Sequence, residues 1–106
     1  MNQLTLTSYL KLLACDGVGV LSARKLLDLS KDVDALFDAS NKQFFADFNI
    51  PKSIQNALLK FDKNDLIEAE AKFIEKNNIQ CVGILDDTYP KLLKECADAP
   101  ILLFYK

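Results

Sequence analysis

The stretch Cys15-Asp16-Gly17-Val18-Gly19 determines the architecture of the first half of this chain. Before it, apolar residues recur at helical spacing up to about Ala14, and after it a second helical pattern begins at Val20. Because glycine tolerates a positive φ, the two glycines can end the first helix and turn the chain directly into the second. The sequence therefore predicts two helices joined by a tight Gly-x-Gly hairpin.

Further helical segments follow this pair. Asp32, Ser40 and Pro51 each stand at the start of an apolar pattern, and all three residue types are favoured at helix starts. The segment 64–77 has the spacing of a longer amphipathic helix with an acidic outer face. We therefore expect residues 1–77 to form one helical domain.

The character of the sequence changes after residue 77. Residues 79–84 are short and β-branched, as in a buried strand, and Pro90 can start one or two helical turns. Residues 101–105 are almost wholly apolar, which is typical of a strand covered on both faces. Since two strands do not make a stable sheet alone, we expect a β-α-β segment that begins a second domain over residues 78–106. We expect the edge of the strand 101–105 to be protected by pairing back on residues 80–84 or by dimerisation.

Composition and charge exclude several classes of function. The 106 residues include no histidine and carry a net charge of -2, so histidine-based catalysis and a broadly basic surface are both excluded. Cys15, Cys81 and Cys96 are widely spaced, which fits neither a zinc site nor a disulfide framework. The chain begins without a signal-peptide pattern, and its apolar runs are too short to span a membrane. We expect a cytoplasmic protein with reduced thiols, no metal, no cofactor, no membrane partner and no enzymatic activity.

The hairpin has the composition of a phosphate-binding site. Glycines let the backbone approach a phosphate closely, and the amides that open the following helix can donate hydrogen bonds to it with help from the helix dipole. Such a contact does not read base identity. The candidate residues are Gly17, Gly19, Arg24, Lys25 and, in a second and degenerate hairpin over residues 48–53, Lys52.

Two features of the hairpin favour other interpretations. Asp16 would oppose a phosphate, and Leu21 occupies the position where many DNA-binding hairpins carry a cation. A tight turn in which the glycines only allow two helices to pack is the alternative explanation of this pattern. A surface that binds protein, made of Leu21 and the strand 101–105, explains the apolar residues.

Four phenylalanines have the helical spacing of core residues, which gives no support for a base-stacking platform: Phe44, Phe45, Phe48 and Phe73.

A longer pattern covers essentially the whole chain. After the hairpin and the helices come Asp87-Thr88-Tyr89-Pro90-Lys91-Leu92-Leu93 and then Ala99-Pro100-Ile101-Leu102-Leu103-Phe104. In this order, the pattern resembles the amino-terminal region of the DNA-processing protein A family (DprA, also called Smf). The resemblance implies a helix–hairpin–helix or sterile-alpha-motif-like (SAM-like) domain, followed by the opening strands of a Rossmann-like domain.

The same resemblance implies a biological role. Proteins of this family bind incoming single-stranded DNA in the bacterial cytoplasm during natural transformation and help to load the RecA recombinase, a step of DNA recombination. We expect this chain to be an accessory, non-enzymatic, amino-terminal piece of such a protein, truncated before the region that binds most of the DNA. The alternative is a protein–protein interaction module, for a partner or for a homodimer, without direct DNA contact.

Overall fold

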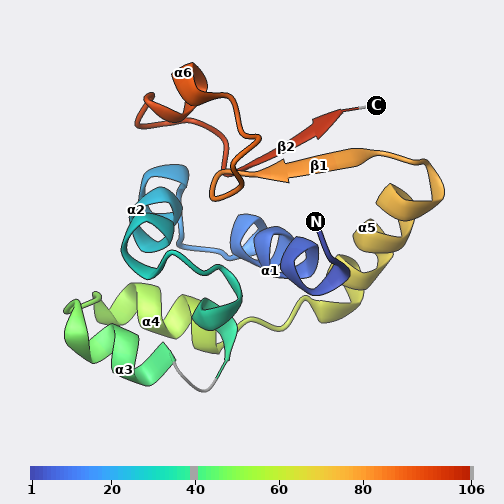
Figure 1. Ribbon diagram of the computed structural model, residues 1–106. Helices are drawn as coiled ribbons and strands as arrows, with labels where there is room; N and C mark the ends of the chain where they lie inside the picture. The colour runs from blue at the N-terminus through green and yellow to red at the C-terminus, as the bar shows by residue number, and fades with distance from the viewer. Residues whose placement is uncertain (39–40, 106) are drawn as a thin grey trace.

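The computed structural model describes residues 1–38 and 41–105 (Figure 1). The described residues are mainly helical with a small two-stranded sheet, as expected from the sequence. In chain order the elements are α1 (Gln3–Ala14), α2 (Val20–Ser30), the 3-10 helix η1 (Asp34–Phe37), α3 (Asn41–Asp47), α4 (Lys52–Leu59), α5 (Asn64–Lys76), β1 (Gln80–Gly83), α6 (Lys91–Lys94) and β2 (Leu102–Tyr105).

The first two helices begin and end close to where the sequence places them. The side chain of Asn2 caps α1 by accepting a hydrogen bond from the Thr5 amide at 2.7 Å. Gly17 has a φ of 88°, so glycine is the residue suited to this turn. Gly19 is the N-cap of α2, which ends at Lys31 in the left-handed conformation.

The starts of the later helices follow the expected residues with local differences. Asp32 accepts a hydrogen bond from the Asp34 amide at 3.0 Å, but it lies one position before the N-cap of η1, which is Val33, and η1 is a 3-10 rather than an α-helix. Ser40, the expected opening residue of the next helix, lies outside the described residues. Pro51 is the N-cap of α4, one position earlier than the first helical position predicted for it. The chain turns into Pro51 through Asn49, whose φ is 51°.

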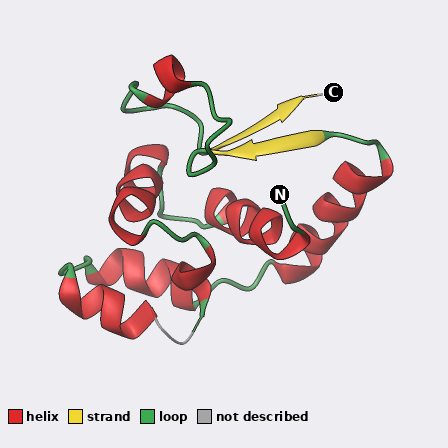
Figure 2. Cartoon of the chain, in the orientation of Figure 1, coloured by secondary structure: helices red, strands yellow, loops and turns green. Residues whose placement is uncertain are grey.

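Helix α1 occupies the centre of the molecule (Figure 1). It contacts α5, η1 and α2, and the two strands lie on its remaining side (Figure 2). The large side chains with almost no exposure lie on both sides of residue 77: Tyr9, Leu12, Leu27, Leu36, Ile67, Ile84 and Ile101. One apolar core therefore continues across residue 77, where the sequence suggested a domain boundary.

The strand 101–105 pairs back on residues 80–84, which confirms one of the two expected ways to protect its edge. β1 and β2 are antiparallel, with Gln80 opposite Tyr105 and Gly83 opposite Leu102. Successive strands of a right-handed β-α-β crossover run parallel, so this pair is instead a hairpin whose long connection carries α6. The expectation that β2 is covered on both faces is wrong for its second half, because Phe104 is 50% exposed and Tyr105 is 55% exposed.

Candidate functional site: the hairpin surface and an apolar groove

The Gly-x-Gly hairpin presents an open helix start to solvent. Gly19 caps α2 without a side-chain hydrogen bond, and the earliest helical acceptor is its carbonyl, which binds the Ala23 amide at 2.9 Å. The amides of Val20 and Leu21 come before Ala23 in the chain, so the helix itself offers them no acceptor. Both residues are exposed. The backbone therefore has the form that a phosphate contact requires.

Arg24, one of the predicted phosphate-binding residues, is committed to contacts within the chain. Its Nη2 donates to the carbonyl oxygen of Lys94 at 2.6 Å, and its Nη1 donates to that of Cys96 at 3.0 Å. Its Nε forms an ion pair with Asp28 at 3.3 Å, and the side chain is only 16% exposed. Arg24 thus ties α2 to the end of α6, and three of its donor atoms are already occupied.

The charge of Asp16 is balanced by a lysine that the sequence reasoning missed. Lys63 Nζ lies 3.0 Å from Asp16 Oδ2 and 3.4 Å from the carbonyl oxygen of Ala14. Lys60 lines the same shallow cleft as Asp16 and Lys63. No local motif marks these lysines, because the turn after α4 brings them to the hairpin from more than 40 positions away.

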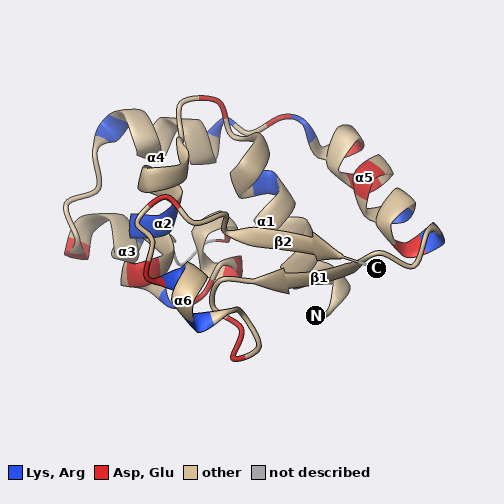
Figure 3. Cartoon of the chain, turned by 90° about the horizontal axis from the view of Figure 1, so that it is seen from above, with Lys and Arg blue, Asp and Glu red and all other residues tan. Residues whose placement is uncertain are grey.

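Lys25 and the second hairpin lie on another side of α2. A groove of about 190 Å³ is lined by Lys25 and Leu29 from α2 and by Pro51 and Ile54 at the start of α4. Lys52 directly follows Pro51 and is exposed, as is Lys25. The structure therefore brings the amino-terminal end of α4 beside α2. In the view of Figure 3, Lys and Arg residues are spread over several elements rather than gathered on one face.

Leu21, the predicted protein-binding residue, is 61% exposed at the first turn of α2. Val20 beside it is 39% exposed. The tip of the hairpin is therefore partly apolar as well as being the start of α2.

The turn Asp86-Asp87-Thr88-Tyr89-Pro90, which includes the start of the stretch that resembles the DprA family, has a structural role. The carboxylate of Asp86 accepts the Gly83 amide at 2.7 Å, and the Asp86 amide donates to the Gly83 carbonyl at 2.9 Å. Tyr89 is buried, and its hydroxyl donates to the carbonyl oxygen of Pro100 at 2.5 Å. These bonds close the connection between the two strands, and they account for the Asp and Tyr without invoking catalysis.

The thiols are free and dispersed. Burial raises the pKa of the Cys15 thiol, helped by the nearby carboxylate of Asp16, and burial likewise raises the pKa of Cys81. Cys96 is exposed. Residues 1–38 and 41–105 contain no cluster of three side chains able to hold a metal ion.

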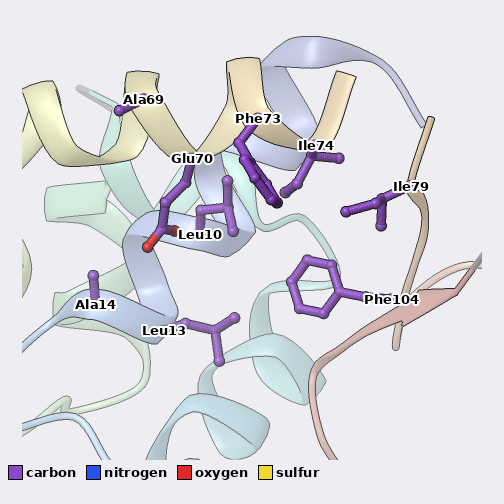
Figure 4. A pocket seen from close by; sticks show the side chains of 9 residues that line it. All are labelled: Leu10, Leu13, Ala14, Ala69, Glu70, Phe73, Ile74, Ile79 and Phe104. Atoms are coloured by element: carbon purple, nitrogen blue, oxygen red, sulfur yellow. The ribbon is translucent and has the colours of Figure 1, made fainter. Parts of the chain in front are cut away.

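A large hollow in the described part of the chain is one that sequence reasoning missed. It is an open apolar groove of about 660 Å³ between α1, α5 and β2 (Figure 4). Its lining residues are Leu10, Leu13, Ala14, Ala69, Glu70, Phe73, Ile74, Ile79 and Phe104. Phe73 has core spacing in the sequence but is 61% exposed here, because nothing in the described residues packs over this side of α5.

Among the helices of the described segments, none combines the length and the apolar character that crossing a membrane requires. The chain matches no protein-family model, no curated protein and no solved structure.

Proposed function

We propose that this chain is a non-enzymatic accessory domain of a DprA-like DNA-processing protein of the bacterial cytoplasm. In this proposal it assists a protein that binds incoming single-stranded DNA and loads RecA during natural transformation. The helical part would correspond to the SAM-like or helix–hairpin–helix unit, and the two strands to the opening of a Rossmann-like domain. The order of the motifs along the chain supports the family assignment.

The hairpin surface is the proposed point of DNA contact. The observation that carries this proposal is the exposed start of α2, where the amides of Val20 and Leu21 follow the N-cap Gly19 and the turn at Gly17. Amides at a helix start bind a phosphate oxygen through hydrogen bonds and the helix dipole. Lys63 offsets the charge of Asp16, so the adjacent carboxylate opposes a phosphate less strongly.

The side chains contribute to this contact unequally. Lys25 and Lys52 are exposed and can approach the phosphate backbone from α2 and α4. Arg24 contributes only indirectly, by holding α2 in place, because its guanidinium is bound to the carbonyls of Lys94 and Cys96. A contact built from a few amides and two lysines is weak, independent of base sequence and sensitive to salt.

Fluorescence anisotropy with labelled oligo-dT at low salt tests the proposal. Val20 is the first residue of α2, where proline is well tolerated, so Val20→Pro removes one amide donor and keeps the helix. We expect Val20→Pro to weaken binding by about tenfold, the effect of losing one hydrogen bond to a charged group. Val20→Ala, the matched control, removes the same side chain without removing the amide and should bind as the natural protein does.

The lysines supply an independent measurement. Replacing Lys25 by Gln should reduce the slope of the logarithm of affinity against the logarithm of salt concentration by about 0.7, the value for one phosphate contact on a single strand. Binding that is absent, that does not respond to salt, or that Val20→Pro leaves unchanged would rule out the hairpin as a phosphate site.

A second candidate function is protein binding through the same tip, favoured by the exposure of Leu21 and Val20. Leu21→Glu separates the two functions. If the tip binds protein, this variant loses association with the remainder of the DNA-processing machinery, RecA included, in a pull-down. If the tip binds only DNA, the added carboxylate weakens oligo-dT binding and leaves protein association intact.

A further inference from the structure

A narrow groove lies between α2 and the start of α4, and we call it the α2–α4 groove. Its walls are apolar and consist of Leu26 and Leu29 from α2 and of Ile50, Pro51 and Ile54 from the second hairpin and α4. Its volume of about 190 Å³ is smaller than the roughly 300–1,000 Å³ of pockets that enclose a whole ligand. The groove therefore has room for one ring-sized part of a larger molecule.

The wall contributed by the second hairpin is fixed by hydrogen bonds. The Ile50 amide donates to the carbonyl oxygen of Phe45 at 3.1 Å, and the Ile50 carbonyl accepts a bond from the side-chain amide of Gln55 at 2.7 Å. Ile50 is itself buried, whereas Leu29 on the α2 wall is 37% exposed. The groove is thus formed in advance and open to solvent, and all of its lining residues lie between positions 22 and 54.

The α2 side of the groove also carries two polar side chains, Ser22 and Lys25. Ser22 is half-buried, and its hydroxyl takes part in no hydrogen bond within residues 1–38 and 41–105. A hydroxyl both donates and accepts hydrogen bonds, so it can bind the edge of any nucleobase. Lys25 is exposed and has no acidic partner among the described side chains. The groove therefore combines an apolar interior with a hydroxyl and a cation that are available to a ligand.

Phosphate-binding features flank the groove on both sides. On one side are Lys25 and the start of α2, which carries the proposed phosphate contact. On the other side the Ile54 amide donates to the Pro51 carbonyl at 3.1 Å, so the amides of Lys52 and Ser53 precede the first bond of α4. Each base of a nucleic-acid strand stands between two phosphates, which matches this arrangement. An apolar side chain of a protein would fit the walls but would leave both flanking features unused.

We propose that the α2–α4 groove binds one unpaired base of the single strand whose phosphates contact the starts of α2 and α4. The inference rests on the proposed phosphate contact and adds to it a site for the base. The aliphatic walls cover the faces of the ring, and the Ser22 hydroxyl meets its edge. Because neither contact depends on base identity, binding stays independent of sequence. A base within a duplex is excluded, because it is paired and stacked and would first have to be flipped out.

A comparison of two labelled strands by fluorescence anisotropy tests the base site. One strand is oligo-dT, and the other has the same length but is built from abasic residues, which keep the phosphates and lack the bases. We expect the natural chain to bind oligo-dT about five- to tenfold more tightly than the abasic strand, toward the lower end of what the burial of one base contributes. Val20→Pro should weaken the binding of both strands alike, because it removes a phosphate contact only.

Leu29→Gln tests the wall of the groove, since it replaces a partly exposed apolar side chain by a polar one without altering the charge. It should weaken oligo-dT binding by about fivefold and leave the binding of the abasic strand unchanged. Ser22→Leu narrows the entrance by its added bulk and should act in the same way. Leu59→Gln is the matched control, because Leu59 is 56% exposed on α4 and does not line the groove. It should bind both strands as the natural chain does, and circular dichroism verifies that each variant is folded.

The two strands separate failure of the base site from failure of the phosphate contact. Equal, salt-dependent affinity of the natural chain for both strands would overturn the base site, keep the phosphate contact and leave the groove to an apolar side chain of a partner protein. Binding of neither strand would overturn both proposals together. A preference for oligo-dT that survives both Leu29→Gln and Ser22→Leu, or that Leu59→Gln abolishes, would place the base elsewhere and so contradict the inference.

Discussion

The aromatic ring of Tyr9 lies directly against Gly83, so closely that a Cβ atom on residue 83 would overlap it. The hydroxyl of the same tyrosine accepts a hydrogen bond from the Leu85 amide at 3.3 Å. The Tyr9 side chain of α1 thereby determines how closely β1 packs against the helix, and it also holds the start of the turn that follows β1. The sheet is attached to the helical part of the molecule at this point.

Gly83→Ala should destabilise the protein. The new methyl group has to displace a buried ring, and overpacking of this kind lowers the free energy of unfolding by about 1–3 kcal/mol. Urea denaturation measures the loss, which should grow in Gly83→Val. Gly19→Ser is the control, since no atom lies within 4 Å of a Cβ at that position and serine is a favoured N-cap residue. Equal losses at the two glycines would contradict the role assigned to Tyr9.

Arg24→Gln should loosen the segment around α6. The variant loses the guanidinium that binds the carbonyls of Lys94 and Cys96, at a cost of about 1–2 kcal/mol in the free energy of unfolding. Amide hydrogen exchange should be faster between residues 91 and 99. Arg24→Lys should not restore protection, because an ammonium group lacks the planar fork that reaches both carbonyls. Lys42→Gln removes the same positive charge at an exposed position on α3, so it serves as the control for the change in net charge.

Lys31→Gly should stabilise the protein. Lys31 ends α2 with a φ of 58°, a conformation that costs a residue with a Cβ atom about 1–2 kcal/mol relative to glycine. The gain in the free energy of unfolding is partly offset by the greater freedom of glycine in the unfolded chain, so we expect an increase of about 1 kcal/mol. The same change in the middle of α5, Lys72→Gly, should have the opposite sign and a similar size. A loss at both positions would contradict this assignment.

Stability should fall at high pH because of Tyr9. Burial raises the pKa of its hydroxyl from 10.0 to about 12, with Asp86 and Asp34 adding to the rise and the Leu85 hydrogen bond opposing it. The unfolded chain therefore releases this proton first, and stability that is complete below pH 10 is lost as the pH rises toward 12. The loss attributable to this group is at most about 3 kcal/mol.

Urea unfolding midpoints measured from neutral to alkaline pH follow this loss. Tyr9→Phe should flatten the decline, because the group responsible is absent, although it also removes the acceptor for the Leu85 amide at every pH. An identical decline in the natural chain and in Tyr9→Phe would assign the effect to other groups.

Local sequence signals predicted local structure well. Gly17 fixes the hairpin through its positive φ, whereas Gly19, also expected to need glycine, has an ordinary extended backbone with a φ of -77°. Asp32 and Pro51 mark helix starts because such signals depend on neighbours a few positions away. Such features are readable without knowledge of the fold.

Long-range contacts were not predictable in this way. Nothing in the neighbourhood of Arg24 indicates that its guanidinium meets residues 70 positions later, and the pairing of Lys63 with Asp16 depends on the path of α4. Helical spacing placed Phe73 in the core because periodicity identifies an apolar face but not what covers it. The apolar groove was not predictable for the same reason, since it forms only where α1, α5 and β2 come together.

The continuous core has a consequence for how the chain folds. Tyr9 and Ile84 share one buried cluster although one lies near the start of the chain and the other beyond residue 77. The helical and strand segments should therefore melt in a single cooperative transition, with the same midpoint by circular dichroism and by tyrosine fluorescence. A polypeptide that stopped at residue 77 would leave Tyr9 facing water, so the helices depend on the strands for their own stability.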